Sequence, residues 1–272
     1  MLLTVDIGNT SVAFGLYEGK TLVQTFRAET VRERTSDEYG VLLRQMLRLK
    51  GIDDAKIAGA ILASVVPPLT DVMVDAIRQA FAREPLVVGP GIKTGISVLY
   101  ENPREVGADR IVNAVAAYDR VAQGVIVVDF GTATTFDCIS PKGEYLGGVI
   151  VPGIQVSLEG LLARAAKLSR IEIAVPPRVV GRNTTHALQS GVVHGYAAMV
   201  DGLVEKIRED LGFPCRVMAT GGLARLIAEQ TTTLESVDEY LTLDGLRILH
   251  ERNQESSSRG RPRPRSERAD EK

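Results

Sequence analysis

A short stretch of this chain occurs twice, and this repeat constrains the fold more than any other feature. Residues 5–10 read VDIGNT and residues 128–133 read VDFGTA. Each copy has an apolar run that ends at an aspartate, a glycine-containing turn, a second apolar run, a polar turn and a third apolar run. This pattern predicts a three-stranded meander in each copy. Chance similarity between two meanders is the alternative, but the repeat favours a duplicated chain.

Helical patterns follow each meander. Thr35 and Glu38 are spaced as a capping box for a helix that runs through Lys50. Further helices are predicted over residues 70–83, 105–121, 154–166 and 185–211, and further strands over residues 57–66, 86–88 and 216–219. This alternation predicts an α/β fold of two similar halves, residues 1–118 and 119–250. Two facing halves make a cleft, which suits a ligand too large for either half alone.

The composition is that of a globular protein. Of the 272 residues, 44% are hydrophobic and 24% are charged, and the formal net charge is -2. This balance gives no electrostatic reason to expect a nucleic acid or a membrane surface as a partner. No apolar run approaches the roughly 18 residues of a membrane span, so we expect a cytoplasmic protein. Cys138 and Cys215 lie in apolar segments and are expected to be buried free thiols.

Residues 251–272 have a different composition. They include no aromatic residue and no aliphatic residue larger than alanine, and serine, arginine and proline are common. Such a segment cannot bury enough apolar surface to offset the entropy of ordering, so we expect a disordered tail. Its RGRPRPR stretch is either simply solvated or a basic contact for an acidic partner.

The two repeated turns have the residues of a phosphate-binding site. Glycine allows positive φ and a close approach to the backbone, and asparagine and threonine add hydrogen-bond donors. The aspartate at the edge of such a turn can hold a divalent cation. One Asp-x-Gly turn alone is more simply structural, but two at equivalent positions favour a clamp for a polyphosphate. Gly221 and Gly222, after a later strand, would suit an adenosine or form only a turn.

Residues 100–117, YENPREVGADRIVNAVAA, lie between the two turns in the sequence. Asp109 and Arg110 stand in or beside the first turns of the helix predicted there. One interpretation is a surface ion pair that interacts with the helix dipole. The other is a carboxylate that accepts a hydroxyl proton beside a guanidinium that holds an anion. The spacing alone leaves both interpretations open.

Five stretches in register resemble the type III pantothenate kinases: DIGNT, NPREVGADR, DFGTATTFD, GGVIVPG and GRNTTHALQSG. The resemblance covers about residues 1–249. It implies a duplicated ribonuclease H-like fold, with a mixed sheet and flanking helices in each half and a nucleotide in the cleft. This is the architecture of the acetate kinase, sugar kinase, actin and chaperone ATPase superfamily. The resemblance also implies a homodimer that phosphorylates pantothenate to 4′-phosphopantothenate with ATP, the first step of coenzyme A synthesis.

The resemblance further implies roles for individual residues. ATP with Mg²⁺ is expected at the first turn and at Thr132, a monovalent cation (K⁺ or NH₄⁺) at Asp129, and the catalytic base at Asp109. The residues implied in ATP binding at the first turn are Asp6, Ile7, Gly8, Asn9, Thr10, Ser11, Val12 and Ala13. The residues implied in pantothenate binding are Tyr100, Gly107, Ala108, Asp109, Arg110 and Thr184. Thr184 is expected at the dimer interface, where its neighbour Thr185 is the alternative.

Two other functions stay open. A kinase of the same superfamily that acts on a sugar or another hydroxy acid would need an acceptor segment different from NPREVGADR. A regulatory member of the family without catalysis would be expected to lack Asp6, Asp109 or Asp129, and all three are present.

Overall fold

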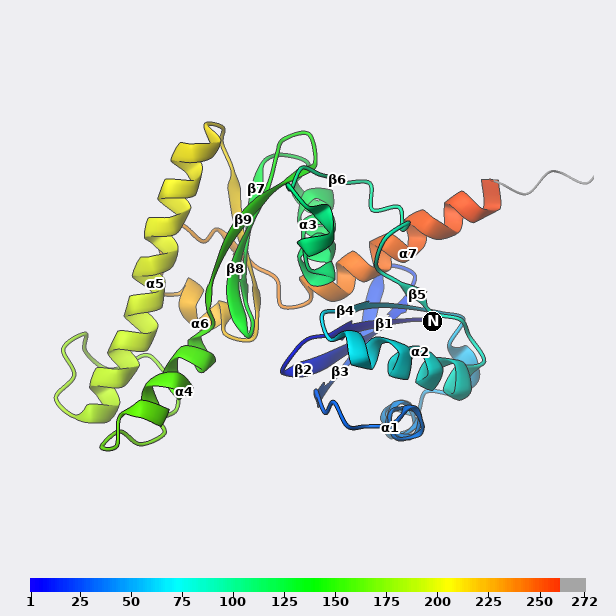
Figure 1. Cartoon of the computed structure of the whole chain (residues 1–272), viewed down its shortest axis with the longest axis horizontal. Coiled ribbons are helices and arrows are strands. Elements are labelled where there is room, and N and C mark those ends of the chain that lie inside the picture. The colour runs from blue at the N-terminus through cyan, green and yellow to red at the C-terminus, as the bar shows by residue number, and fades with distance from the viewer. Residues whose placement is uncertain (260–272) are drawn as a thin grey trace, which may run out of the picture.

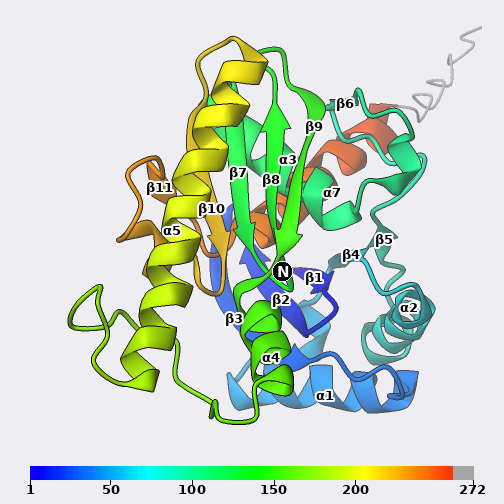
Figure 2. The same ribbon diagram turned by 60° about the vertical axis from the view of Figure 1, so that its left-hand side comes forward.

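The computed structural model describes residues 1–259, with the side chains of residues 1–254. It contains two β-sheets covered by helices, and two further helices that lie between the sheets (Figure 1). Figure 2 shows the central strands of the second sheet side by side, with a long helix across one face. No helix in this described part of the chain is long and apolar enough to cross a membrane.

The first sheet has the strand order β3-β2-β1-β4-β5. Its strands are β1 (Leu2–Ile7), β2 (Ser11–Glu18), β3 (Thr21–Glu29), β4 (Gly59–Ser64) and β5 (Leu86–Val87). The first three strands form an antiparallel meander, and β4 pairs with β1 in parallel. The register places Asp6, Ala13 and Arg27 opposite one another on β1, β2 and β3, so their side chains share one face of the sheet.

The second sheet has the strand order β11-β10-β7-β8-β9-β6. Its strands are β6 (Ser97–Val98), β7 (Val125–Phe130), β8 (Ala133–Ile139), β9 (Glu144–Pro152), β10 (Arg216–Gly221) and β11 (Ser236–Val237). Here β7, β8 and β9 form the antiparallel meander, and β10 pairs with β7 in parallel. Asp129 stands opposite Thr135 as Asp6 stands opposite Ala13. The predicted duplication is therefore confirmed.

Helices α1 (Ser36–Leu49) and α2 (Pro67–Phe81) pack on one face of the first sheet. The capping box of α1 is confirmed, because the Thr35 side chain accepts from the Glu38 amide and the Glu38 carboxylate accepts from the Thr35 amide. The predicted start of α2 at residue 70 is wrong by three residues. Pro67 and Pro68 begin this helix. Proline is tolerated there because the first N–H groups of a helix have no partner within the helix, so a missing N–H group costs nothing.

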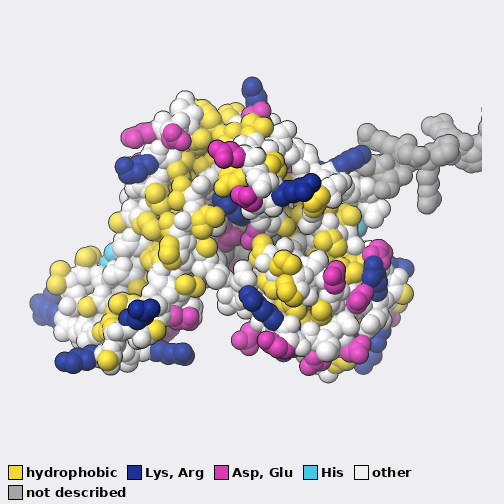
Figure 3. Space-filling view, in the orientation of Figure 1, with side chains coloured by type: hydrophobic (Ala, Val, Ile, Leu, Met, Phe, Trp, Pro, Cys, Tyr) yellow, Lys and Arg dark blue, Asp and Glu magenta, His cyan; other side chains and the backbone are white. Residues whose placement is uncertain are grey.

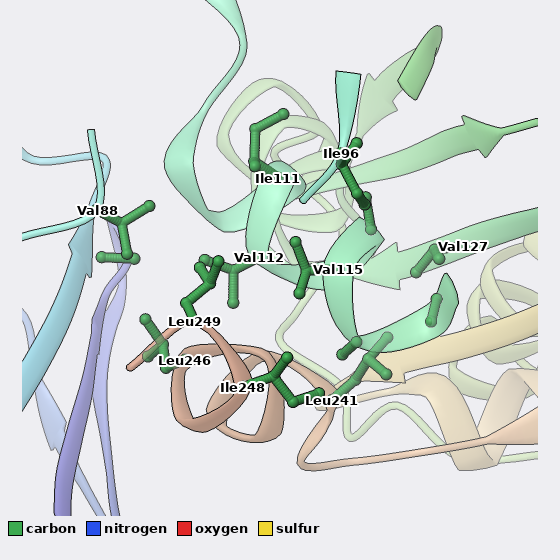
Figure 4. Close-up of a cluster of buried hydrophobic side chains, with 14 of the residues drawn as sticks. Val88, Ile96, Ile111, Val112, Val115, Val127, Leu241, Leu246, Ile248 and Leu249 are labelled. Carbon is green, nitrogen blue, oxygen red and sulfur yellow. The ribbon is translucent and has the colours of Figure 1, made fainter. Parts of the chain in front are cut away.

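Helices α3 (Ala108–Val121) and α7 (Leu241–Arg259) pack against each other between the two sheets. Figure 4 shows the buried apolar core that they form with strands of both halves. It includes Val112 and Val115 of α3, Leu246 and Leu249 of α7, and Val127 of β7. This core holds the two halves together.

Three more helices, α4 (Ile154–Arg164), α5 (Thr184–Leu211) and α6 (Ala224–Ala228), lie on the other face of the second sheet. Cys138 and Cys215 belong to the core beneath them, and both are buried and free, as predicted. Helix α4, residues 165–183 and the beginning of α5 protrude beyond the sheet as a lobe, called here the α4–α5 lobe (Figure 2).

The expectation of disorder from residue 251 is wrong for residues 251–259, which continue α7. The reason is a set of polar contacts rather than apolar burial. Arg252 donates to the carbonyl of Thr94 and to the Asp119 carboxylate, and Asn253 exchanges two hydrogen bonds with the backbone of Lys93. The rest of the predicted tail, including RGRPRPR, lies outside the described residues.

Two elements cross the boundary predicted near residue 118. Strand β6 precedes the boundary but pairs with β9 of the second sheet. Helix α7 follows it but packs against β1 and β4 of the first sheet. The division into residues 1–118 and 119–250 stays a prediction, and the crossing elements tie the two parts together.

Arg252→Ala should lower the free energy of unfolding by about 1–2 kcal/mol, because it removes a charged donor from Thr94 and Asp119. Urea denaturation followed by circular dichroism measures the change. Arg48→Ala, at an exposed position in the last turn of α1, is the control and should leave the midpoint unchanged. Equal stability of the two variants would show that the contacts of Arg252 do not hold α7 in place.

Candidate active site

The two repeated turns meet directly in the folded chain. The Oγ1 atoms of Thr10 and Thr132, which follow β1 and β7, lie 2.8 Å apart and share a hydrogen bond. The space-filling view shows a notch between the α4–α5 lobe and the half built on the first sheet, with acidic side chains at its closed end (Figure 3). Residues far apart in the sequence therefore line one cleft, as the duplication predicts.

Each turn is held by backbone hydrogen bonds. The Gly8 amide donates to the Ser11 carbonyl, and the Gly131 amide donates to the Ala133 carbonyl. Neither glycine has a positive φ, so the expectation that glycine is needed here for positive φ is wrong. At Gly8 the requirement is space, because a Cβ atom would stand 3.1 Å from the Ser11 carbonyl oxygen.

A helix N-terminus beside the second turn favours an anion. Helix α4 begins at the second turn, where the Gly153 amide donates to the Thr132 carbonyl. The free amides and the dipole at a helix N-terminus attract phosphate. In the first turn the side chains of Ile7 and Val12 are buried in the core, so these residues can face a ligand only through their backbone. Of the other members of this predicted set, Asn9 and Thr10 are exposed, and Asp6, Gly8, Ser11 and Ala13 are partly exposed.

Three carboxylates, those of Asp6, Asp109 and Asp129, interact electrostatically near the place where the turns meet. Burial raises the pKa of Asp6 to about 8, and the charges of Asp109 and Asp129 contribute to the rise, whereas Arg27 opposes it. Burial likewise raises the pKa of Asp129 to about 7, with added repulsion from Asp109 and Asp137. These groups cannot all be ionised at neutral pH without added positive charge.

The carboxylate oxygens at this place are suitable ligands for a cation that binds together with phosphate. Asp6 and Asp129 supply the carboxylate oxygens that Mg²⁺ and K⁺ take as ligands, and Asn113 orients Asp129 by donating to its Oδ2 at 2.9 Å. Thr242 of α7 in turn donates to Asn113. No three acidic, histidine or cysteine side chains in the described part of the chain form a metal site by themselves. Mg²⁺ commonly uses one or two carboxylates and completes its shell with water and phosphate oxygens.

Asp109 lies in the first turn of α3, within electrostatic range of Asp6 and Asp129. Its Oδ1 accepts from the Arg110 amide at 2.8 Å. A Cβ atom on Gly107 would stand 2.5 Å from the same oxygen, so glycine is required beside it. Burial raises the pKa of Asp109 above its ordinary value.

Arg110 is buried and does not form a surface ion pair with Asp109. Its Nε donates to Asp137 Oδ1 at 2.6 Å, and the Tyr145 hydroxyl donates to the same oxygen at 2.7 Å. Thr135 donates to the other oxygen of Asp137. The surface-pair interpretation is therefore wrong. One guanidinium nitrogen, Nη2 of Arg110, is buried without a hydrogen-bond partner in the described residues.

Tyr100 lies beside this network. Its ring centroid is 6.4 Å from that of Tyr145, and a Cβ atom on Gly147 would contact the Tyr100 ring at 3.5 Å. A Cβ atom on Gly148 would approach Arg110 Nη2 at 3.1 Å. Gly148 is required by the backbone beside it, because a Cβ atom there would also stand 1.7 Å from the Phe136 carbonyl oxygen. Tyr100, Gly107, Ala108, Asp109 and Arg110 therefore lie together, next to the cleft.

Thr184 stands apart from this group. It is the exposed first residue of α5, in the α4–α5 lobe, after Asn183, whose side chain caps the helix. No hydrogen bond within the described residues joins Thr184 or Thr185 to Tyr100, Asp109 or Arg110. A single chain does not bring Thr184 into the acceptor pocket.

The fold and the meeting of two phosphate-type turns define the class of kinases and ATPases that includes sugar kinases and actin. Solved structures have the same fold. One is a conserved protein from Campylobacter jejuni, provisionally assigned to the Baf family of transcriptional activators, with a TM-score of 0.58 and 19% identity over 93% of this chain and 99% of that one. Another is component A of (R)-2-hydroxyglutaryl-CoA dehydratase from Acidaminococcus fermentans, with a TM-score of 0.51 and 13% identity over 90% and 94% of the chains. At these identities the likeness shows the fold alone.

Sequence comparison shows the family. The family model described as type III pantothenate kinase matches residues 2–206. A type III pantothenate kinase from Myxococcus xanthus is 54% identical over 256 residues, which cover 94% of this chain and 100% of the relative. The chain belongs to the type III pantothenate kinase family. The predicted family and the predicted fold class are confirmed.

Asp137→Asn should lower the free energy of unfolding by about 3 kcal/mol or more, because it leaves the buried Arg110 guanidinium without its counter-charge. Urea denaturation measures this loss. Glu84→Gln, which breaks an exposed pair with Arg78, is the matched control and should leave the midpoint unchanged. If the two variants had the same midpoint, the Arg110–Asp137 pair would not contribute to the free energy of unfolding.

Proposed function

We propose that the protein transfers the γ-phosphate of ATP to the 4′-hydroxyl of pantothenate, giving 4′-phosphopantothenate and ADP. The observation that carries this proposal is the position of Asp109, which lies within electrostatic range of the aspartates of both repeated turns and accepts from the amide of Arg110, whose Nη2 has no partner among the described residues. A carboxylate there has a phosphate site on one side and an acceptor pocket on the other. Membership of the pantothenate kinase family supports this acceptor.

The triphosphate lies across the two turns. The backbone of residues 6–13 and the Thr132 side chain supply hydrogen-bond donors from opposite sides, and the N-terminus of α4 adds a favourable dipole. Fixed donors of this kind stabilise charge that develops on the transferring phosphoryl group. Gripping the polyphosphate from both halves aligns its terminal phosphorus with the acceptor.

Pantothenate occupies the pocket of Tyr100 and Arg110. Its carboxylate pairs with the guanidinium, which Asp137 and Tyr145 hold in one orientation. Asp109 accepts the proton of the attacking hydroxyl, and its raised pKa makes its carboxylate a stronger base. Phosphoryl transfer has a loose transition state, so positioning and electrostatics supply most of the acceleration.

Two cations complete the charge balance. Asp6 and Asp129 would hold Mg²⁺ together with the phosphates, and Asp129 would hold a monovalent cation, K⁺ or NH₄⁺. When bound, these ions supply positive charge beside the phosphates. The chain's own part is to keep the carboxylates oriented, which Asn113 does for Asp129.

The active unit is a homodimer in this proposal. Five large apolar side chains are exposed on the α4–α5 lobe: Val156, Leu161, Val175, Val179 and Val180. Such a patch supports burial against a second copy. The exposed start of α5 in that lobe would then bring Thr184 of one copy to the pantothenate pocket of the other. We expect neither nucleic acid nor a membrane as a partner, and we place the reaction in the cytoplasm.

The test is coupled ADP release with pantothenate, compared with a panel of sugars and short hydroxy acids. Release with pantothenate alone supports the proposal. Release with a sugar instead would identify a different kinase of the superfamily. Tight binding of pantothenate or ATP without any turnover would favour the regulatory alternative.

Asp109→Asn should fold normally and lose about two or more orders of magnitude in kcat, the usual scale for a positioned base. Steady-state kinetics measures this loss, and calorimetry checks that pantothenate still binds. Asp71→Asn, at an exposed position on α2, is the control. Near-wild-type turnover by the Asp109→Asn variant would remove Asp109 from the mechanism.

Turnover should require K⁺ or NH₄⁺, and replacing K⁺ with Na⁺ at constant ionic strength should lower it sharply. The reason is that Asp129 is a largely buried carboxylate beside phosphates and needs a counter-charge. Asp129→Ala should abolish the response to K⁺ and weaken ATP binding, whereas Asp71→Ala should keep both. Equal rates in Na⁺ and K⁺, at saturating Mg²⁺-ATP and pantothenate, would refute the potassium assignment and leave the kinase proposal intact.

A further inference from the structure

Arg27 is a charged residue of the cleft that has no role in the site described so far. It lies on β3, opposite Ala13 of β2, which in turn lies opposite Asp6 of β1. The three side chains therefore share the sheet face that carries Asp6 toward the second half. Because Ala13 has only a methyl group, no bulky side chain separates Arg27 from Asp6.

The Arg27 side chain also reaches across the cleft. Its Nη1 lies 4.0 Å from the point where a Cβ atom on Gly222 would stand, in the turn that follows β10. Its positive charge favours the ionised forms of both Asp6 and Asp129. The guanidinium of this exposed residue thus lies beside the turn after β10, within electrostatic range of Asp6 and Asp129.

Within the described part of the chain, Arg27 makes no hydrogen bond and no ion pair. Arg110 is instead bound to Asp137, and Arg32 donates to Asn9 of the first turn. The meander does not need a cation at this position either. In the second copy the equivalent residue is Ile150, which lies opposite Thr135 as Arg27 lies opposite Ala13. The donors of Arg27 therefore serve no structural partner.

We propose that Arg27 binds the triphosphate of the nucleotide with paired N–H donors, an inference that rests on the proposed ATP-dependent reaction. The planar guanidinium matches two phosphate oxygens at once, which the single ammonium group of lysine does not. Arg27 reaches the phosphates from β3, so it clamps them against the turns on β1 and β7. The proposal gives it no part in holding pantothenate, because no contact joins Arg27 to Tyr100 or Arg110 within the described residues.

Isothermal titration calorimetry on the full chain tests this role, with a non-hydrolysable ATP analogue plus Mg²⁺ in one series and pantothenate in another. Arg27→Gln should weaken analogue binding about 10- to 100-fold, the scale of a lost charge-assisted contact, and leave the Kd of pantothenate unchanged. Arg27→Lys should recover only part of the loss. Arg48→Gln removes the same charge from the exposed face of α1 and should bind both ligands as the unmodified protein does.

Three results would overturn the proposal. Analogue binding by Arg27→Gln equal to that of Arg48→Gln would mean that Arg27 does not contact the nucleotide. Full recovery of analogue affinity in Arg27→Lys would mean that binding depends only on a positive charge near Asp6 and Asp129, and not on the paired donors of a guanidinium. An equal loss of pantothenate affinity, or a fall in melting temperature, would indicate a structural role. An unmodified protein that binds the analogue but phosphorylates no pantothenate would refute the proposed function, while the comparison of Arg27 variants would still decide this inference.

Discussion

The repulsion among Asp6, Asp109 and Asp129 is the constraint on which the rest of the structure depends. Burial raises the pKa of all three carboxyls, and the charge of Asp109 adds to the rise at Asp6 and Asp129. Ionised carboxylates held this way destabilise the fold, and packing elsewhere offsets the cost. Each large aliphatic side chain buried between α3 and α7 contributes about 1.5–3 kcal/mol, and that core joins both halves. The packing of α3 and α7 thus holds three acidic side chains near one another in spite of their repulsion.

Local signals are sufficient for most of the fold. The Asp-x-Gly repeat predicts both meanders, and Thr35 with Glu38 predicts the start of α1, because these features depend only on neighbouring residues. The end of α7 cannot be predicted in the same way. It is held by contacts of Arg252 and Asn253 with Thr94 and Lys93, more than 150 positions away in the sequence. A polar composition is typical of disorder unless such distant partners are known.

The candidate site shows the same division. Aspartates at strand ends and the Gly-Ala-Asp-Arg segment can be identified from spacing and resemblance. Asn113, Asp137 and Tyr145 cannot, since their roles depend on which strands and helices pack together. The one signal is an acidic residue inside the apolar run of β8, where an unpaired charge would be costly. That charge implies a buried partner, but only the fold identifies it as Arg110.

The two copies of the meander have diverged in a way that divides the chemistry between them. By strand register, Asp137 of the second copy corresponds to Gly15 of the first, where a Cβ atom would stand 2.6 Å from Thr4 Oγ1. The first copy therefore has no room for an acid there, and it has a cation, Arg27, where the second has Ile150. The first copy thus has a positive charge without a partner among the described residues, and the second uses negative charge to fix Arg110. The proposed reaction assigns the first charge to phosphate and Arg110 to the acceptor. A symmetric clamp would bind a polyphosphate equally from both sides. Transfer of a phosphoryl group to a second substrate needs two unlike sides, and the two copies differ at Arg27 and Ile150 and at Gly15 and Asp137.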